Sequence, residues 1–310
     1  MAEQTNKIRN CFERYLTECE YSKKLRPKTM IGYREVLNNF LNLIPEVETP
    51  EDIKPFMVSE FFKRLGERAK GNGIELKVST IRTYYNKLMV FFRWLEEHDY
   101  IEKYSLSKKI VKPPNPTYED EKALNESEVS KIISAIALNN SEDEFMYKRD
   151  LVIVSILLYT GIRRGELLGL RTYDIDFEER TLFINGKTSK SRKSRFIPLH
   201  YSLLMNLKSY LKLCKKRRLK CEHLIVSSRQ DRAFTDHGLK HWVDKYIRLS
   251  GVKFHIHRFR HTFACTLAKQ NADIISIMNV LGHSSTLMTE RYLRSIKSEN
   301  SRLFIEKLSY

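Results

Sequence analysis

The hydrophobic pattern of the chain differs between its first hundred residues and the rest. In the first part, apolar side chains recur every three or four positions, which is the spacing of amphipathic helices. They are Ile8, Cys11, Phe12, Tyr15, Leu16 and Cys19; Tyr33, Val36, Leu37, Phe40 and Leu41; Met57 to Leu65; and Ile81, Tyr84, Tyr85, Leu88, Phe91, Phe92 and Leu95. This pattern predicts four helices and no strand, with Ser79 or Thr80 as the N-cap of the last helix. We interpret the aromatic side chains as core rather than as a platform for stacking bases.

The pattern changes after a proline-rich break. Residues 106–122 have no helical period and predict an exposed linker. Beyond them, Asn125 and Glu128 form a capping pair for a helix, and the apolar run 151–159 predicts a buried helix. Residues 173–199 alternate and turn like two or three short antiparallel strands. Helical spacing resumes after them.

These patterns predict a mainly α protein with two domains. Residues 1–105 form a helical domain, residues 106–122 a linker, and residues 123–310 an α+β domain with a small antiparallel sheet.

The charge of the chain points to a polyanionic partner. Its 310 residues hold 55 Lys and Arg against 38 Asp and Glu, a net charge of +17. Such an excess is typical of proteins that bind nucleic acid. Both halves are basic, so either can face phosphate.

Other features of composition exclude secreted and membrane proteins. The five cysteines, Cys11, Cys19, Cys214, Cys221 and Cys265, are few and scattered, which is typical of a reduced cytoplasm without disulfides. No apolar run approaches the ~18 residues of a membrane span. The first ten residues lack the apolar core of a signal peptide, so we expect a cytoplasmic protein.

Unusual polar residues follow the predicted buried helix directly. A turn at Gly161 would direct Arg163 away from the core, and Glu166, three residues later, can hold its guanidinium. Taken alone, this pair is better explained as an ordinary surface ion pair.

A second candidate lies in the predicted sheet. Asn185-Gly186 is a strong hairpin signal, and the turn would project Lys187 from the end of a strand. Because Lys190, Arg192, Lys193 and Arg195 surround Lys187, a generic basic loop explains this segment equally well.

The third candidate is rich in histidine. On a helix, His257, Arg260 and His261 share one face. The two histidines stand at a spacing of four but lack the intervening glutamate of a zinc protease helix, so we expect no metal site.

The fourth candidate is a turn between two helices. Gly282 is suited to end one helix and Ser285 to begin the next, which places His283 in the turn and Tyr292 two turns further on.

Together these segments hold the side chains for phosphoryl transfer without a metal. Two guanidiniums can bind the oxygens of a phosphodiester and stabilise its transition state. A tyrosine hydroxyl can attack phosphorus, and a lysine or histidine can protonate the departing oxygen.

The order of the motifs resembles the tyrosine recombinase (phage integrase) family. The matching motifs are TGIRRGELLGL, NGK, HRFRH and LGHSS, followed by a tyrosine nine residues after the LGH histidine. The helical N-terminal domain resembles the core-binding domain of that family. The resemblance implies that Arg163 and Arg260 are the two catalytic arginines and that Lys187 is the hairpin lysine. It further implies that His257 and His283 are the active-site histidines, that Tyr292 is the nucleophile and that Glu166 is a supporting acid.

Two features depart from the common pattern. His255 stands where a proline often precedes the HxxR motif, and a separate arm-binding domain is not recognisable. In length the chain is similar to Xer-type recombinases and simple transposon integrases.

The resemblance implies a site-specific DNA recombinase that needs no cofactor. Tyr292 would form a 3′-phosphotyrosyl link to double-stranded DNA, and four protomers would act on two duplexes. The apolar positions in the tail, Leu303, Phe304, Ile305 and Leu308, imply that the tail packs on a neighbouring protomer, although packing on its own domain is the alternative.

Several other functions fit parts of this pattern. A type IB topoisomerase shares the covalent chemistry but needs no second duplex. A DNA-binding regulator without catalysis would not need the complete residue set, and a metal-dependent nuclease would need clustered carboxylates. Among recombinases we favour integration of a mobile element over Xer-type resolution of chromosome dimers.

Overall fold

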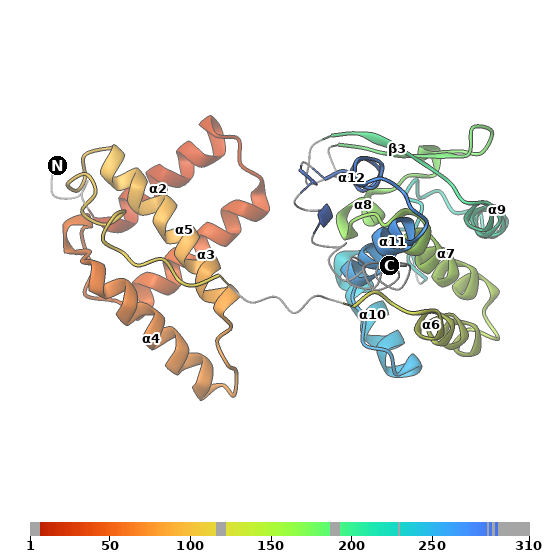
Figure 1. Ribbon diagram of the computed structural model, residues 1–310, viewed down its shortest axis with the longest axis horizontal. Helices are drawn as coiled ribbons and strands as arrows, with labels where there is room; N and C mark the ends of the chain where they lie inside the picture. Colours follow the sequence, from red (N-terminus) through yellow and green to blue (C-terminus); the bar gives the residue numbers. More distant parts are fainter. Residues whose placement is uncertain are drawn as a thin grey trace, which may run out of the picture. The chain divides into compact units, whose positions relative to one another are not determined.

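The computed structural model describes residues 7–115, 122–186, 193–228, 230–283, 285–286 and 289–290 (Figure 1). The chain divides into two compact units, Met1–Tyr118 and Glu119–Tyr310. Each unit has its own hydrophobic core. Within the described ranges, no helix is both long and apolar enough to cross a membrane.

The N-terminal unit is helical, as the periodicity predicts. Its described residues contain no strand. Its elements are α2 (Ile8–Thr17), the π-helical turn η1 (Glu18–Ser22), α3 (Pro27–Leu43), the 3₁₀ turn η2 (Pro50–Asp52), α4 (Pro55–Gly71) and α5 (Val78–Glu97).

Aromatic side chains form the centre of this unit. Tyr15, Phe91, Phe92 and Trp94 are all buried, and the rings of Tyr15 and Phe91 lie 5.4 Å apart between centroids. The prediction that the aromatic residues are core is therefore confirmed.

The beginning of α5 differs from the prediction. The N-cap is Lys77, whose backbone is extended, and the helix starts at Val78. Ser79 and Thr80 already lie in the first turn, so the prediction that one of them caps the helix was wrong. The Ser79 carbonyl instead accepts a hydrogen bond of 2.8 Å from the Thr83 hydroxyl.

The predicted linker begins later than residue 106. Leu106 and Ile110 are buried in the N-terminal core. The Glu96 carboxylate accepts hydrogen bonds from the backbone N–H groups of Leu106 and Ser107, at 2.9 and 2.8 Å. These bonds hold the segment after α5 against its own unit, so its first residues are not an exposed linker.

The second unit combines seven helices with a small sheet in its described residues. The helices are α6 (Glu126–Asn139), α7 (Glu144–Thr160), α8 (Arg164–Gly169), α9 (Tyr201–Lys216), α10 (Asp236–Ser250), α11 (Ile256–Lys269) and α12 (Ile274–Leu281). The turn η3 (Thr172–Asp174) precedes the strands β1 (Ile175–Asp176), β2 (Thr181–Ile184) and β3 (Arg195–Pro198).

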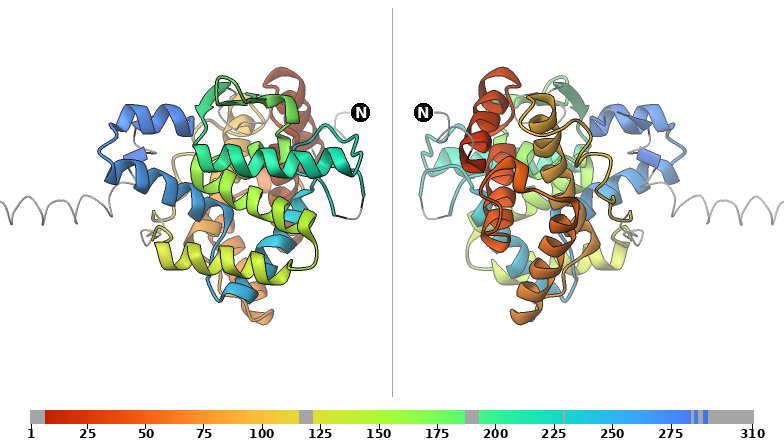
Figure 2. Two further views of the ribbon diagram at one scale, coloured as in Figure 1. Left: turned by 90° about the vertical axis from the view of Figure 1, so that its right-hand side faces the viewer. Right: turned by 90° about the vertical axis from the view of Figure 1, so that its left-hand side faces the viewer.

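Helix α7 is the centre of the second unit. It packs against α6, α9 and α11, and Figure 2 shows α9, α7 and α6 side by side in that order. Its residues Val152 to Val154 are fully buried, because a helix that is apolar on all sides must be covered on all sides. The predicted buried helix and the predicted cap of α6 are both confirmed, since Glu128 N–H donates to the Asn125 side chain at 2.8 Å.

The three strands form an antiparallel sheet in the order β1-β2-β3. Ile184 at the end of β2 is paired with Arg195 at the start of β3. Asn185 and Gly186 therefore begin a connection over residues 185–194 rather than forming a two-residue hairpin turn. The Gly186 N–H donates to the Ser194 hydroxyl at 3.0 Å, which closes the base of this connection.

Candidate active site

Two of the predicted arginines meet at the C-terminal end of α12. The helix ends at Gly282, whose φ of 66° is left-handed. The last carbonyls of a helix have no partner within it and must find donors elsewhere. Arg260 Nη2 donates to the Leu281 carbonyl at 2.7 Å, and Arg163 Nη2 donates to the Gly282 carbonyl at 2.9 Å. The helix end therefore holds both guanidiniums side by side.

Glu166 orients Arg163, as its spacing predicts. The Glu166 carboxylate accepts from Arg163 N–H at 2.9 Å and from Arg163 Nη1 at 3.0 Å. The Glu166 side chain is fully buried, whereas that of Arg163 stays 20% exposed. A substrate can therefore reach Arg163 but not the acid behind it.

Arg260 is buried and joins two helix ends. Its side chain donates through Nη1 to the Gly161 carbonyl at 2.9 Å, in addition to its bond to α12. Gly161 ends α7 with a φ of 57°, and a Cβ atom there would come within 2.5 Å of the Phe263 ring. Only glycine suits this position, so the turn predicted at Gly161 is required by its backbone and by its packing.

His283 follows directly after the two arginine acceptors. Its Nδ1 lies 2.8 Å from the Thr289 hydroxyl, and the residue is only 8% exposed. Burial, followed by the positive charges of Arg260 and Arg163, lowers the pKa of His283 to about 3. The imidazole is therefore neutral at physiological pH.

His257 stands in the first turn of α11, one turn before Arg260. The residue is exposed. Loss of water around its imidazole, followed by the charges of Arg260 and His255, lowers the pKa of His257 to about 4. Two neutral imidazoles thus accompany the two arginines.

Two predicted site residues, Lys187 and Tyr292, lie outside the described residues. The site as described therefore brings together Arg163, Glu166 and Arg260 with the two histidines. Within the described ranges, no group of three or more histidine, cysteine, aspartate or glutamate side chains could hold a metal ion.

Arg195 belongs to the same cluster, which the sequence reasoning missed. Its neighbours in sequence indicate a basic loop around Lys187, yet its guanidinium contacts Glu166 at 2.9 Å. The alternation along β3 could have revealed this position, because Arg195 shares a strand face with Ile197. Ile197 is buried, whereas Phe196 between them is 66% exposed.

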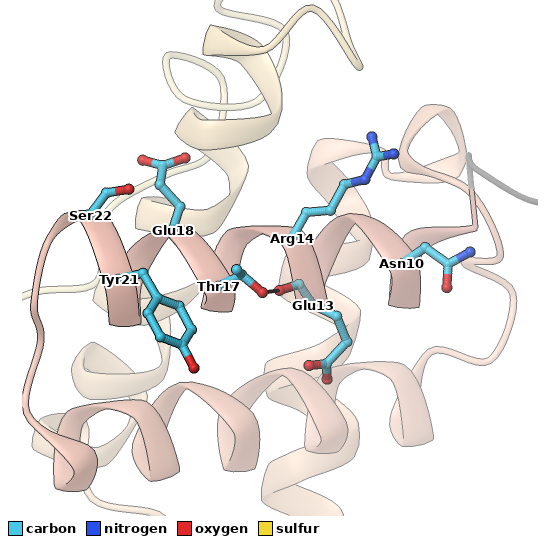
Figure 3. A pocket seen from close by; sticks show the side chains of 7 residues that line it. All are labelled: Asn10, Glu13, Arg14, Thr17, Glu18, Tyr21 and Ser22. Carbon is cyan, nitrogen blue, oxygen red and sulfur yellow. Dashed lines mark hydrogen bonds between the residues drawn. The ribbon is translucent and has the colours of Figure 1, made fainter.

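A hollow on the N-terminal unit differs from this cluster in its charges. Figure 3 shows the side chains of α2 and η1 that line it, among them Glu13, Arg14 and Glu18. Glu13 pairs with Arg34 at 2.7 Å, and Glu18 pairs with Lys23 at 2.9 Å. Both signs of charge line the hollow and its acids are paired, so it lacks the excess of positive charge found around Arg163 and Arg260.

What the cluster can do follows from its charge. The planar guanidinium can donate two hydrogen bonds to the oxygens of a phosphate and stabilise charge that develops on them. A neutral imidazole can accept a proton from a nucleophile or donate a hydrogen bond to an oxyanion. The arrangement is suited to reactions at a phosphodiester.

Comparison with known protein families agrees with this chemistry. Residues 122–299, more than half of the chain, match the phage integrase family, and residues 12–90 match the phage integrase N-terminal SAM-like domain. The first match includes every predicted site residue.

Individual proteins are similar along nearly the whole chain. A tyrosine recombinase of Agathobacter rectalis is 29% identical over 97% of this chain and 97% of its own length. The crystal structure of the XerH recombinase bound to its palindromic difH substrate is 21% identical, with a TM-score of 0.71 over 94% of this chain and 83% of that chain. The Tn1549 transposon integrase in complex with transposon right end DNA is 20% identical, with a TM-score of 0.67 over 93% of this chain and 98% of that chain. At these identities the two structures show a shared fold.

The low pKa of His283 predicts that acid destabilises the protein. The folded state keeps this imidazole neutral down to about pH 3, whereas an unfolded histidine titrates near about 6.5. Between these values the unfolded state binds more protons, so stability falls as the pH falls. From pH 6.5 to pH 4 this residue should cost roughly 3 kcal/mol.

Urea unfolding of the unsubstituted protein and of His283→Asn, each at pH 7 and pH 4, measures this contribution. We expect the unsubstituted protein to lose about 3 kcal/mol more than the variant between the two pH values. Equal losses would show that His283 is protonated in the folded state.

Proposed function

Because the chain belongs to the phage integrase family, we propose that its reaction centre lies at the C-terminal end of α12. As a member of that family it is a tyrosine recombinase, which cleaves and rejoins DNA at specific sites. The observation that carries the proposal is the convergence of Arg163, Arg260 and His283 on this helix end. The proposed catalytic residues are Arg163, Lys187, His257, Arg260, His283 and the nucleophile Tyr292, with Glu166 supporting Arg163.

The scissile phosphate of double-stranded DNA binds at the arginines. Arg163 is partly exposed, so its guanidinium can approach the non-bridging oxygens. Arg260 adds a second positive charge from behind, in a buried position where charge interactions are stronger than in water. Both arginines are already fixed by carbonyls, so little reorganisation is needed when charge develops in the transition state.

The reaction proceeds by exchange of one phosphodiester bond for another. The Tyr292 hydroxyl attacks phosphorus and gives its proton to a neutral imidazole of the site. The bond from phosphorus to the 5′-oxygen breaks, and Lys187 protonates that oxygen. The product is a 3′-phosphotyrosyl link and a free 5′-hydroxyl. Attack by the 5′-hydroxyl of a partner duplex reverses these steps, so neither ATP nor a metal ion is required.

Both units bind the DNA duplex. Residues 1–118 carry 21 basic and 16 acidic side chains, a net charge of +5, and the remaining residues carry 34 and 22, a net charge of +12. Both charges favour contact with phosphates, and most of the affinity comes from many such contacts. The helical N-terminal unit acts as the core-binding domain and the second unit as the catalytic domain.

A groove in the second unit accepts the C-terminal tail of another protomer. The groove has a volume of about 900 Å³ between α6, α11 and the segment after β3. Its apolar lining includes Val129, Ile133, Leu158, Phe263 and Leu267. The tail lies outside the described residues, but its apolar positions at helical spacing, such as Phe304, fit an apolar groove. Exchange of tails would link four protomers on two duplexes.

Integration of a mobile element, the role expected from the sequence, stays a prediction. A transposon integrase bound to a transposon end and a Xer recombinase bound to difH have the same fold. The DNA beside the gene distinguishes the two roles and supplies the target site: a mobile element carries inverted repeats or an attachment site, and a chromosomal role requires a dif-like site elsewhere.

Tyr292 should be the only residue that becomes linked to DNA. When the protein acts on a nicked duplex that carries its target site, the cut end diffuses away and the covalent adduct accumulates. Peptide mapping of the adduct should identify Tyr292, and Tyr292→Phe should bind the duplex normally and form no adduct. A link to Tyr246 or to any other residue would refute the assignment.

Lys187 should act as the general acid. General acid catalysis contributes about 10²- to 10⁴-fold in rate, and Lys187→Ala should lose about that much. A 5′-bridging phosphorothiolate replaces the departing oxygen with sulfur, which leaves without a proton, so the defect should largely disappear on that DNA. Lys193→Ala, which removes an exposed neighbour, serves as the matched control and should cleave normally. Equal slowing of Lys187→Ala on both substrates would make Lys187 a phosphate contact.

The tail proposal predicts how variants combine. Phe304→Asp in the tail and Val129→Asp in the groove should each reduce assembly of the protein on duplexes that carry its site, because each places a charge in an apolar contact. When the two variants are mixed, the intact groove of one can accept the intact tail of the other, so pairs but no closed tetramers should form. Light scattering measures the size of these complexes, and a tail that packs on its own protomer would restore nothing on mixing.

A further inference from the structure

Arg195 is the first residue of β3, and its side chain lies on the inward face of the strand. Its side chain is only 9% exposed, although the other basic residues near it in sequence include the exposed Lys193. A buried arginine needs partners for its charge and its N–H groups, because leaving them unpaired costs several kcal/mol. The partners of the Arg195 guanidinium therefore indicate its role.

Those contacts join three separate elements. Arg195 Nη1 and Nη2 donate to the two oxygens of Glu166 on α8, at 3.1 and 2.9 Å. Its Nε donates to the Val280 carbonyl near the end of α12, at 2.7 Å. A Cβ atom on Gly282 would lie 2.9 Å from Arg195 Nη1, so the backbone of this turn packs directly on the guanidinium.

Glu166 is thus shared between two arginines. Each of its oxygens accepts one bond from Arg163 and one from Arg195. One carboxylate between two guanidiniums leaves a net charge of one positive unit, whereas Glu166 with Arg163 alone would be neutral. Arg195 therefore offsets the carboxylate that orients Arg163 and keeps the site positive.

We propose that Arg195 is a positioning residue for DNA cleavage. It holds Glu166 so that Arg163 is oriented without being neutralised, and it fixes the turn that places His283 beside the phosphate. The inference rests on the proposed function, since it assigns Arg195 a role in the reaction of Arg163. Arg195 contacts no substrate itself and acts through Glu166 and the end of α12.

The test compares Arg195→Gln and Arg195→Lys with the unsubstituted protein in single-turnover cleavage of the nicked duplex. A small displacement of a catalytic group can cost about 10²-fold in rate, and we expect about that loss for Arg195→Gln. DNA affinity should change by no more than about twofold, because Arg195 is one cation among many. Arg195→Lys keeps the charge but not the two-point contact, so its rate should lie between the two.

A neutral phosphate analogue separates the electrostatic role from a structural one. A methylphosphonate at the scissile position lacks the negative charge that Arg163 must stabilise. The defect of Arg195→Gln should therefore shrink to less than about tenfold on this DNA, whereas a merely misfolded variant would be equally slow on both. Arg171→Gln is the control for loss of an arginine outside the cluster. Arg171 pairs with Glu222 at the surface, at 3.3 Å, and this variant should cleave like the unsubstituted protein.

Three results would overturn the role of Arg195 and leave the proposed function in place. The first is normal cleavage by Arg195→Gln, and the second is equal slowing on phosphate and methylphosphonate. The third is loss of the fold in both Arg195 variants, which would make the residue purely structural. Failure of the unsubstituted protein to form an adduct through Tyr292 is a different result. It would overturn the proposed function, and the role of Arg195 with it.

Discussion

The carbonyl groups at the end of α12 are the constraint on which the site depends. A helix ends with carbonyls that its own backbone cannot satisfy and with the negative end of its dipole. Here residues 280–282 end the helix inside the unit, and Arg195, Arg260 and Arg163 donate to their three carbonyls. The side chains come from β3, α11 and the start of α8. A single helix end therefore gathers three cations, and the residue that follows it, His283, is placed among them.

This gathering of charge determines the protonation of the site. Glu166 accepts hydrogen bonds from two of these guanidiniums, Arg163 and Arg195, while Arg260 donates to backbone carbonyls. The cluster therefore stays positive, and a further proton nearby is unfavourable. Burial and these charges keep His283 and His257 neutral. A neutral imidazole can accept a proton at neutral pH, whereas a protonated imidazole cannot. The positive charge of the guanidiniums would attract a phosphate and also keeps the imidazoles neutral. One arrangement of charge therefore serves both effects.

Features that depend on neighbouring residues could be predicted from the sequence, and features that depend on distant ones could not. The cap of α6 by Asn125 and Glu128 and the left-handed ends at Gly161 and Gly282 are local, and all three are confirmed. The bond from Arg260 to Gly161 spans 99 positions, and only the family resemblance brought these segments together. Arg195 was missed because a row of basic residues indicates a solvated loop, while its burial depends on Glu166, 29 positions earlier. The predicted cap of α5 was wrong for another reason. Two hydroxyl residues favour an N-cap, but Lys77, with its extended backbone, occupies that position and the helix already begins at Val78.

The two arginines that meet at the end of α12 differ in burial, and this difference determines what each can contact. Arg260 is 1% exposed and donates to the ends of both α7 and α12, so removing it would leave two buried carbonyls without these donors, a cost of about 1–3 kcal/mol each. Arg163 is held on one side by Glu166 and α12 and is open on the other. Arg260 therefore holds the two helix ends together, and the partly exposed Arg163 is positioned by that rigid surrounding structure. Preorganisation in this unit is a property of its packing: the donors are in place before any phosphate arrives, because the helix ends require them there.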